Sequence, residues 1–202
     1  RLERGAIDFD LPEAEVKMGD KDIPSSLGRA THMASHSLIE EFMLAANEAV
    51  AEESVSAELP VLFRVHAAPD AAKLEPFRSL AGSLGYRLAG AGAITSGHLQ
   101  KALEALQARP DTALLSQLLL RAMMRACYAT DAADGHFGLA SERYLHFTSP
   151  IRRYPDLVVH RALRAHIGQT DEVCRDEGLD WLAEWTSHCE RRAEAAERDY
   201  IR

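Results

Sequence analysis

Apolar residues at helical spacing constrain the fold of this chain more than any other feature of its sequence. Between residues 32 and 53 they recur every three or four positions, which is the pattern of one long amphipathic helix. The same periodicity predicts further helices over residues 70–84, 99–107, 114–128, 156–167 and 179–201. Helices should therefore dominate the fold.

Strand-like segments are short by comparison. They are residues 7–9, Val16, residues 61–65 and residues 139–147. Residues 19–29 contain Gly, Pro and Ser turn signals and are predicted to form a loop. With 202 residues, 47% of them hydrophobic, the chain can bury one sizeable core. The expected fold class is α+β, helix-rich with a few β-strands.

Cysteine usage and hydropathy predict a cytoplasmic protein. Cys127, Cys174 and Cys189 are odd in number and widely spaced, which argues against a disulfide framework and against a zinc site. No apolar run approaches the length of a membrane span, and no signal-peptide segment follows the N-terminal residues. We therefore expect a reducing compartment and no membrane partner.

The run HFTSPIRRYPDLVVHR at residues 146–161 concentrates groups that bind anions. Ser149 is a good N-cap and Pro150 suits the first position of a helix, so free N–H groups would lie beside Arg152 and Arg153. Backbone donors, the helix dipole and a planar guanidinium all favour a phosphate. A solvated arginine pair at an ordinary helix start explains the same spacing.

Pro155 modifies this prediction. A proline deep inside a helix removes a hydrogen bond and clashes with the preceding turn. The regular helix is therefore expected to begin between residues 151 and 156, and the irregular entry before it would form the site.

The same run resembles the C-terminal signature of the RNB catalytic domain, the core of the ribonuclease II and ribonuclease R family of processive 3′-to-5′ exoribonucleases. The sequence RRYPD at residues 152–156 is more similar to the ribonuclease R branch. Other segments are similar to parts of the domain and follow in the family's order. They are residues 4–13, 35–48, 62–66 and 135–140.

The resemblance implies that residues 1–202 are the C-terminal part of an RNB domain. In the family, an aspartate cluster with a D-x-D-D-like core binds magnesium, and it precedes the segment that residues 4–13 match. This chain lacks that cluster, and the resemblance assigns Asp8 and Asp10 to the downstream segment. The cold-shock and S1 domains that flank the family's catalytic domain are not recognised here either. We expect a magnesium-dependent enzyme in the full-length parent and no activity in the isolated chain.

The resemblance also implies roles for individual residues. Arg152 matches the arginine that contacts the phosphate next to the cleaved bond, and it is the expected catalytic residue. Glu40 or Glu41 matches a glutamate that holds the terminal nucleotide through ribose hydroxyls, and the sequence does not choose between them. No residue is predicted to bind a metal. The remaining predicted substrate contacts are Thr148, Ser149, Arg153 and Tyr154.

These substrate contacts have structural alternatives, and Arg153, Thr148 and Ser149 can each orient the site instead of binding phosphate. Either hydroxyl of Thr148 and Ser149 can cap a helix, and Tyr154 can pack instead of stacking on a base. The net charge of −8 argues against autonomous RNA binding, because phosphate neutralisation favours basic proteins. Two functions therefore stay open. One is part of an exoribonuclease that hydrolyses single-stranded RNA to nucleoside monophosphates, and the other is a truncated or degenerate RNB module that binds RNA or protein without catalysis.

Overall fold

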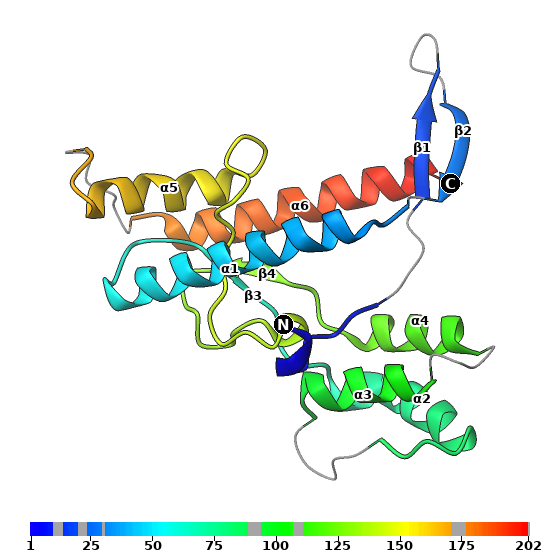
Figure 1. Ribbon diagram of the computed structural model, residues 1–202. Helices are drawn as coiled ribbons and strands as arrows, with labels where there is room; N and C mark the ends of the chain where they lie inside the picture. The colour runs from blue at the N-terminus through cyan, green and yellow to red at the C-terminus, as the bar shows by residue number, and fades with distance from the viewer. Residues whose placement is uncertain are drawn as a thin grey trace.

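The computed structural model describes residues 1–9, 14–19, 24–29, 31–88, 94–106, 111–170 and 177–201, and every structural statement refers to these residues. Figure 1 shows their arrangement. The α-helices are α1 (Ala34–Ser56), α2 (Ala71–Ser83), α3 (Ser96–Leu106), α4 (Thr112–Ala122), α5 (Tyr154–His166) and α6 (Leu179–Ile201). The strands are β1 (Ala14–Met18), β2 (Pro24–Arg29), β3 (Phe63–Val65) and β4 (Cys127–Ala129). The α+β, helix-rich fold class is confirmed.

Helix α6 has the predicted bounds, whereas the prediction for residues 114–128 is wrong at its C-terminal end. Helix α4 stops at Ala122, and Met123 after it is extended. Cys127 and Tyr128 belong to β4, where Tyr128 pairs with Arg64 of β3. Pairing with a segment distant in sequence overrides the local helical periodicity there.

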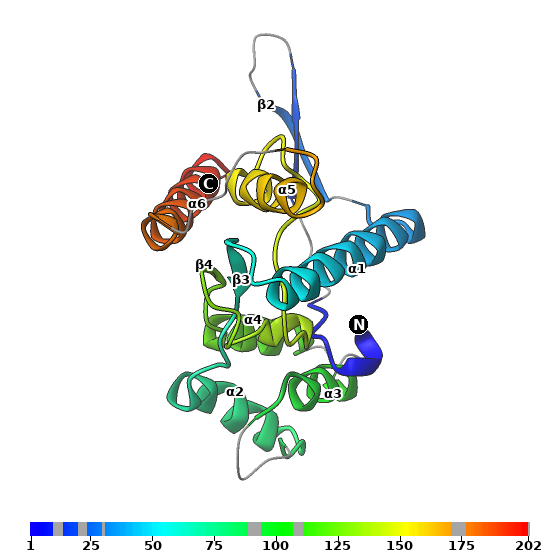
Figure 2. The same ribbon diagram turned by 90° about the vertical axis from the view of Figure 1, so that its left-hand side faces the viewer.

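The prediction of a loop over residues 19–29 is also wrong in part. Strand β2 pairs antiparallel with β1, and the register shifts between Lys17 and Met18, opposite Pro24. The Ser25 hydroxyl donates to the Lys17 carbonyl at 3.0 Å. Both views show this hairpin extending away from the helices (Figures 1 and 2). Proline at the irregular end of a two-stranded ribbon leaves the ladder intact, so turn-forming residues did not exclude a strand.

Two other predicted strands do not form. Residues 7–9 are irregular, and the N–H of Ile7 donates to the carbonyl of Gly138 at 2.8 Å. Residues 139–147 make only isolated bridges, one of which joins Leu145 to Phe63. These residues turn around β3 and do not run alongside it, so they form single bridges and no continuous strand.

The two larger hydrophobic clusters of the described residues lie on either side of the small β3–β4 sheet, and a smaller one joins β4 to α6. Figure 2 shows α5 and α6 above this sheet and α2 and α3 below it. The upper core joins the sheet to the C-terminal half of α1 and to α5, through Ala51, Val61, Phe63, Val65, Leu145, Val159 and Ala162. The lower core joins α2, α3 and α4, with fully buried Leu74, Phe77, Leu99, Leu115 and Leu119.

The apolar stripe of α1 is buried along only half of its length. The C-terminal half buries Asn47, Ala51 and Ser54. In the N-terminal half Leu38, Ile39 and Phe42 are all more than half exposed. The predicted helix is confirmed, but these three apolar side chains of its first turns stay exposed. In the described part of the chain, no helix has the length and apolar character that crossing a bilayer requires.

Candidate functional site

The run at residues 146–153, which we call the signature loop, leads into α5 at Tyr154. Arg153 is the N-cap residue and Pro155 lies in the first turn, so the helix begins within the predicted interval. Ser149 does not cap it. The Ser149 carbonyl instead accepts the N–H groups of Arg152 and Arg153, at 3.3 and 3.1 Å. The helix begins at Tyr154 and not at Ser149, as the geometry of Pro155 predicted, because Pro155 then occupies a position that needs no N–H donor.

Asp156 holds the signature loop through two hydrogen bonds. Its side chain is fully buried, and its Oδ1 accepts from the N–H of Ser149 at 2.8 Å and from Nη2 of Arg153 at 2.7 Å. Among the described residues, its Oδ2 has no partner. Burying a carboxylate is costly unless a counter-charge and hydrogen-bond donors replace the lost hydration. Arg153 is therefore bound to the protein, and the loop is folded around one carboxylate oxygen.

Arg152 differs from its neighbour. It is exposed, and within the described ranges its guanidinium forms no ion pair or hydrogen bond. Ile151 beside it is fully exposed and Tyr154 is half exposed. The Thr148 hydroxyl is buried and finds no partner among the described residues. Of the two adjacent arginines, Arg153 is paired with Asp156, whereas Arg152 is exposed and has no partner among the described residues.

An aromatic and charged framework supports the loop from behind. The hydroxyl of Tyr128 and Nδ1 of His146 are hydrogen-bonded at 2.9 Å. The guanidinium of Arg64 lies 4.8 Å from the centroid of the Tyr128 ring and pairs with both carboxylate oxygens of Glu190, at 2.5 and 2.9 Å. Strand β3, strand β4 and helix α6 thus meet under the loop's first residue.

Helix α1 fixes the loop from another side. The buried amide of Asn47 donates to the Tyr144 hydroxyl at 2.9 Å and accepts the N–H of Phe147 at 3.0 Å. The Phe147 ring stacks on His160 of α5, 4.2 Å between centroids, and Nε2 of His160 is hydrogen-bonded to the Phe147 carbonyl. One amide therefore positions both ends of the segment that enters the loop.

Burial keeps the aromatic framework neutral. Desolvation and the nearby Arg153 and Arg64 lower the pKa of His146 to about 3, and desolvation raises the pKa of Tyr128 to about 12. Desolvation likewise lowers the pKa of His136 to about 3. These groups are hydrogen-bonding supports and not proton carriers near neutral pH.

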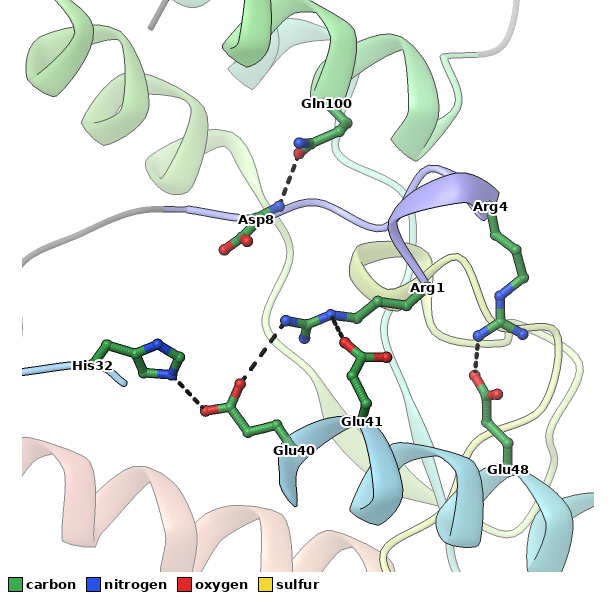
Figure 3. Close-up of polar contacts among 8 residues, drawn as sticks. All are labelled: Arg1, Arg4, Asp8, His32, Glu40, Glu41, Glu48 and Gln100. Atoms are coloured by element: carbon green, nitrogen blue, oxygen red, sulfur yellow. Dashed lines mark hydrogen bonds and ion pairs between the residues drawn. The ribbon is translucent and has the colours of Figure 1, made fainter. Parts of the chain in front are cut away.

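Glu40 and Glu41 lie on the exposed half of α1 and face the N-terminal segment (Figure 3). Nε of Arg1 is 2.8 Å from Oε1 of Glu41, and its Nη2 is 3.9 Å from Oε2 of Glu40. His32 is 3.1 Å from Glu40. Across the described ranges, no contact joins either glutamate to the signature loop. The structure therefore gathers Thr148, Ser149, Arg152, Arg153 and Tyr154 and leaves the two glutamates in a separate ionic cluster.

Several residues that support the signature loop were not predicted from the sequence. Arg64 and Glu190 are 126 positions apart, so no local spacing joins them. Asn47 is one polar residue in an apolar helical pattern, and such a residue in a buried face is a usable signal. Asp156 is part of the motif, but its burial depends on the positions of the Ser149 N–H and the Arg153 guanidinium, which a local pattern does not give.

The described residues do not fit a magnesium site. Nowhere in these ranges do three His, Cys, Asp or Glu side chains gather as metal ligands would. The backbone N–H of Asp8 donates to the Gln100 side chain at 2.9 Å, and Asp10 lies outside the described residues.

Comparisons with known proteins agree with this geometry. The family model for the RNB domain matches residues 1–169. Ribonuclease R of Aquifex aeolicus (strain VF5) is 42% identical over 204 residues, covering 100% of this chain and 29% of the relative. Ribonuclease R of Escherichia coli (strain K12) is 37% identical over 210 residues, covering 98% and 26%. The chain thus spans less than a third of the length of these relatives.

Solved structures share the fold. The apo form of Mycoplasma genitalium RNase R matches 98% of this chain and 32% of its own, with a TM-score of 0.89 and 28% identity. Yeast Ssd1, described as a pseudonuclease, matches 79% of this chain and 20% of its own, with a TM-score of 0.68 and 29% identity. The resemblance inferred from the signature run and its companion segments is confirmed: this chain belongs to the RNB domain family.

Proposed function

We propose that this chain is part of a 3′-to-5′ exoribonuclease that hydrolyses single-stranded RNA to nucleoside monophosphates, and that it supplies the phosphate-binding wall of the site. One observation carries the proposal. Of two adjacent arginines, Arg153 is held by the buried Asp156, whereas Arg152 is exposed and unpaired within the described residues. A loop that fixes one arginine and presents the next is suited to grip a phosphate.

Arg152 would act on the phosphate next to the cleaved bond. A guanidinium can donate two parallel hydrogen bonds to phosphate oxygens, and it stabilises negative charge that gathers there in the transition state. Arg153 then acts as a positioning residue, because its contact with Asp156 sets the shape of the loop. This role replaces direct substrate contact for Arg153.

The other loop residues have narrower roles. The N–H of Ser149 is used by Asp156, which leaves its hydroxyl and the unpartnered Thr148 hydroxyl as candidate donors to the ligand. The half-exposed Tyr154 ring can stack on a base. Glu41 is the better ribose ligand of its pair, since Arg1 takes only one of its oxygens while His32 and Arg1 take both oxygens of Glu40.

The rest of the active enzyme would lie outside this chain. We propose that the full-length parent depends on magnesium, with carboxylate ligands supplied by another part of the protein, and that cold-shock and S1 domains contribute RNA affinity in the cytoplasm. The isolated chain is then inactive. This fits the described residues, which offer phosphate recognition without a cluster of metal ligands.

Substitution of Arg152 in the full-length protein tests the proposal. Arg152→Ala should lower kcat on a single-stranded oligoribonucleotide by about 100-fold or more, the usual effect of removing one donor to a transition-state anion. RNA affinity measured by anisotropy should change little. The matched control is Arg161→Ala, which removes an exposed arginine two turns into α5. Equal turnover of the Arg152→Ala protein and the wild type would refute the role.

One observation favours a second candidate, an RNB module without catalysis. The fold of this chain is shared by a protein described as a pseudonuclease. Magnesium-dependent release of nucleoside monophosphates by the full-length protein would exclude this candidate, and RNA binding without release would favour it.

A further inference from the structure

Helix α6 carries a row of exposed aromatic rings that the proposed phosphate site does not use. Trp181 and Trp185, the only two tryptophans of the chain, are 63% and 47% exposed. Their rings are nearly parallel, at 7°, with centroids 5.8 Å apart, and the His188 ring continues the row 5.9 Å beyond Trp185. Exposing two tryptophans costs hydrophobic free energy, so a ligand that covers the row would recover it.

A pocket of about 470 Å³ lies beside this row. Its lining combines the three rings with Cys127, Tyr128, Glu184, Ser187 and Arg191. Arg191 is exposed, and its guanidinium forms no ion pair with any part of the chain that the structure describes. The pocket thus joins flat aromatic faces, one available cation and one carboxylate acceptor within the volume typical of small-ligand sites.

The exposed side chains of this surface are of the type that binds single-stranded nucleic acid. On α6, among the residues whose side-chain burial the structure describes, the exposed large apolar residues are all aromatic, namely Trp181, Trp185 and the distant Tyr200. The exposed face of α1 is mainly aliphatic, with Leu38 and Ile39 beside Phe42. Aromatic faces next to a free cation are the pattern that binds single-stranded nucleic acid without sequence preference.

We propose that the pocket formed by Trp181, Trp185, His188 and Arg191 binds an unpaired nucleotide of single-stranded RNA. The base adds to the ring row, Arg191 contacts its phosphate, and the Glu184 carboxylate accepts from a donor on the base edge. The inference rests on the proposed function only in taking RNA as the ligand. It adds a contact outside the signature loop.

The pocket is linked to the signature loop through Tyr128. Tyr128 lines it, and the Tyr128 hydroxyl is hydrogen-bonded to His146, the first residue of the loop. Glu190, next to Arg191 in sequence, pairs with Arg64, whose guanidinium lies over the Tyr128 ring. An RNA strand in the pocket would thus be held by the same framework that supports Arg152.

The test measures RNA affinity and turnover separately in the full-length protein. The double variant Trp181→Leu/Trp185→Leu and the single variant Arg191→Gln are compared with wild type by anisotropy of a 5′-labelled single-stranded oligoribonucleotide, in EDTA to prevent cleavage. The double variant should lose about 10-fold in affinity or more, and Arg191→Gln somewhat less. Turnover at saturating RNA should stay near that of wild type.

Matched controls remove comparable groups outside the pocket. Tyr200→Leu deletes the third exposed aromatic of α6, and Arg198→Gln deletes another exposed arginine of the same helix; both should bind RNA like wild type. Trp181→Phe/Trp185→Phe retains aromatic faces and should keep much of the affinity. If tryptophan loss only unfolded α6, the Phe variant would restore folding, and its affinity would then decide the question.

The outcomes distinguish this site from the proposed function. Unchanged RNA affinity in the Leu double variant overturns the pocket as an RNA site. If the same variant also has a smaller mass in solution, the tryptophans make a protein contact instead. Loss of affinity with normal saturated turnover supports it. Arg152→Ala addresses the other proposal, because it should lower turnover while leaving the tryptophan-dependent part of the affinity intact.

Discussion

Asp156 and Arg153 form an ion pair at the first turn of α5, with Nη2 of Arg153 2.7 Å from Oδ1 of a carboxylate that is fully buried. The same oxygen accepts the backbone N–H of Ser149. One atom thereby closes a loop of eight residues and fixes the direction in which Arg152 leaves it. The pair links the stability of the loop to the presentation of the proposed phosphate ligand.

Asp156→Ala should lower the free energy of unfolding by about 3 kcal/mol or more, because it leaves a largely buried guanidinium and a backbone N–H without their acceptor. Asp156→Asn keeps one acceptor oxygen and should lose less. Urea denaturation measures both, with the exposed Glu194→Ala on α6 as the control that changes little. Equal stability of Asp156→Ala and wild type would show that the pair does not hold the loop.

Asn47→Ala should cost about 2 kcal/mol, since it leaves the Phe147 N–H unpaired and removes the donor to the Tyr144 hydroxyl. Both partners are half-buried or buried, so water does not fully replace the amide. Thermal unfolding compares this variant with Glu52→Ala, an exposed position one turn further along α1. A similar loss in both variants would contradict a specific role for the amide.

Stability should fall as the pH drops from about 6.5. The folded chain resists protonation of His136 and His146, whose pKa values are about 3, whereas the same residues in the unfolded chain take up protons near 6.5. Their contribution is therefore fully present above pH 6.5 and is lost progressively between 6.5 and 3. Each histidine adds up to about 1.4 kcal/mol per pH unit within this window.

Urea denaturation at pH 7, 6 and 5 measures this slope in the range where few carboxylates titrate. His146→Gln removes one of these two histidines. It should reduce the slope of the free energy of unfolding against pH by up to about 1.4 kcal/mol per pH unit, the contribution of one proton. A slope that is unaffected by this substitution would mean that His146 is protonated in the folded protein.

Arg152→Lys should restore only part of the turnover lost in Arg152→Ala. Lysine keeps the charge but lacks the planar fork that donates two parallel hydrogen bonds, so kcat should remain about 10-fold below wild type. Single-turnover kinetics at saturating RNA measures the chemical step. Full activity with lysine would show that Arg152 contributes charge alone and no bidentate contact.

Local sequence patterns predicted the elements better than the site. The bounds of α6, and the start of α5 near Pro155, follow from periodicity and from one proline's geometry. The end of α4 did not follow, because Tyr128 pairs with Arg64 across 64 positions. Side-chain pairing over such separations depends on the assembled fold, and no local pattern encodes it.

The same limit applies to the site residues. The motif indicated Arg152 as the catalytic residue and Arg153 as a phosphate or orienting partner, and the ion pair with the buried Asp156 favours the orienting role for Arg153. Glu40 and Glu41 were predicted near the substrate, but Arg1 and His32 are the neighbours that the structure gives them. Their part in RNA binding stays a prediction.

The contrast between the exposed Arg152 and the buried Arg153–Asp156 pair has a consequence for ionic strength. At 0.1 M salt the screening length is about 10 Å, so interactions between solvent-exposed charges weaken as salt is added. Buried pairs are screened far less. Raising the salt concentration should therefore weaken the attraction between Arg152 and a phosphate while the loop keeps its shape. Counterions would compete with the phosphate for Arg152 and leave the Arg153–Asp156 pair in place, so turnover lost at high salt would return fully on dilution.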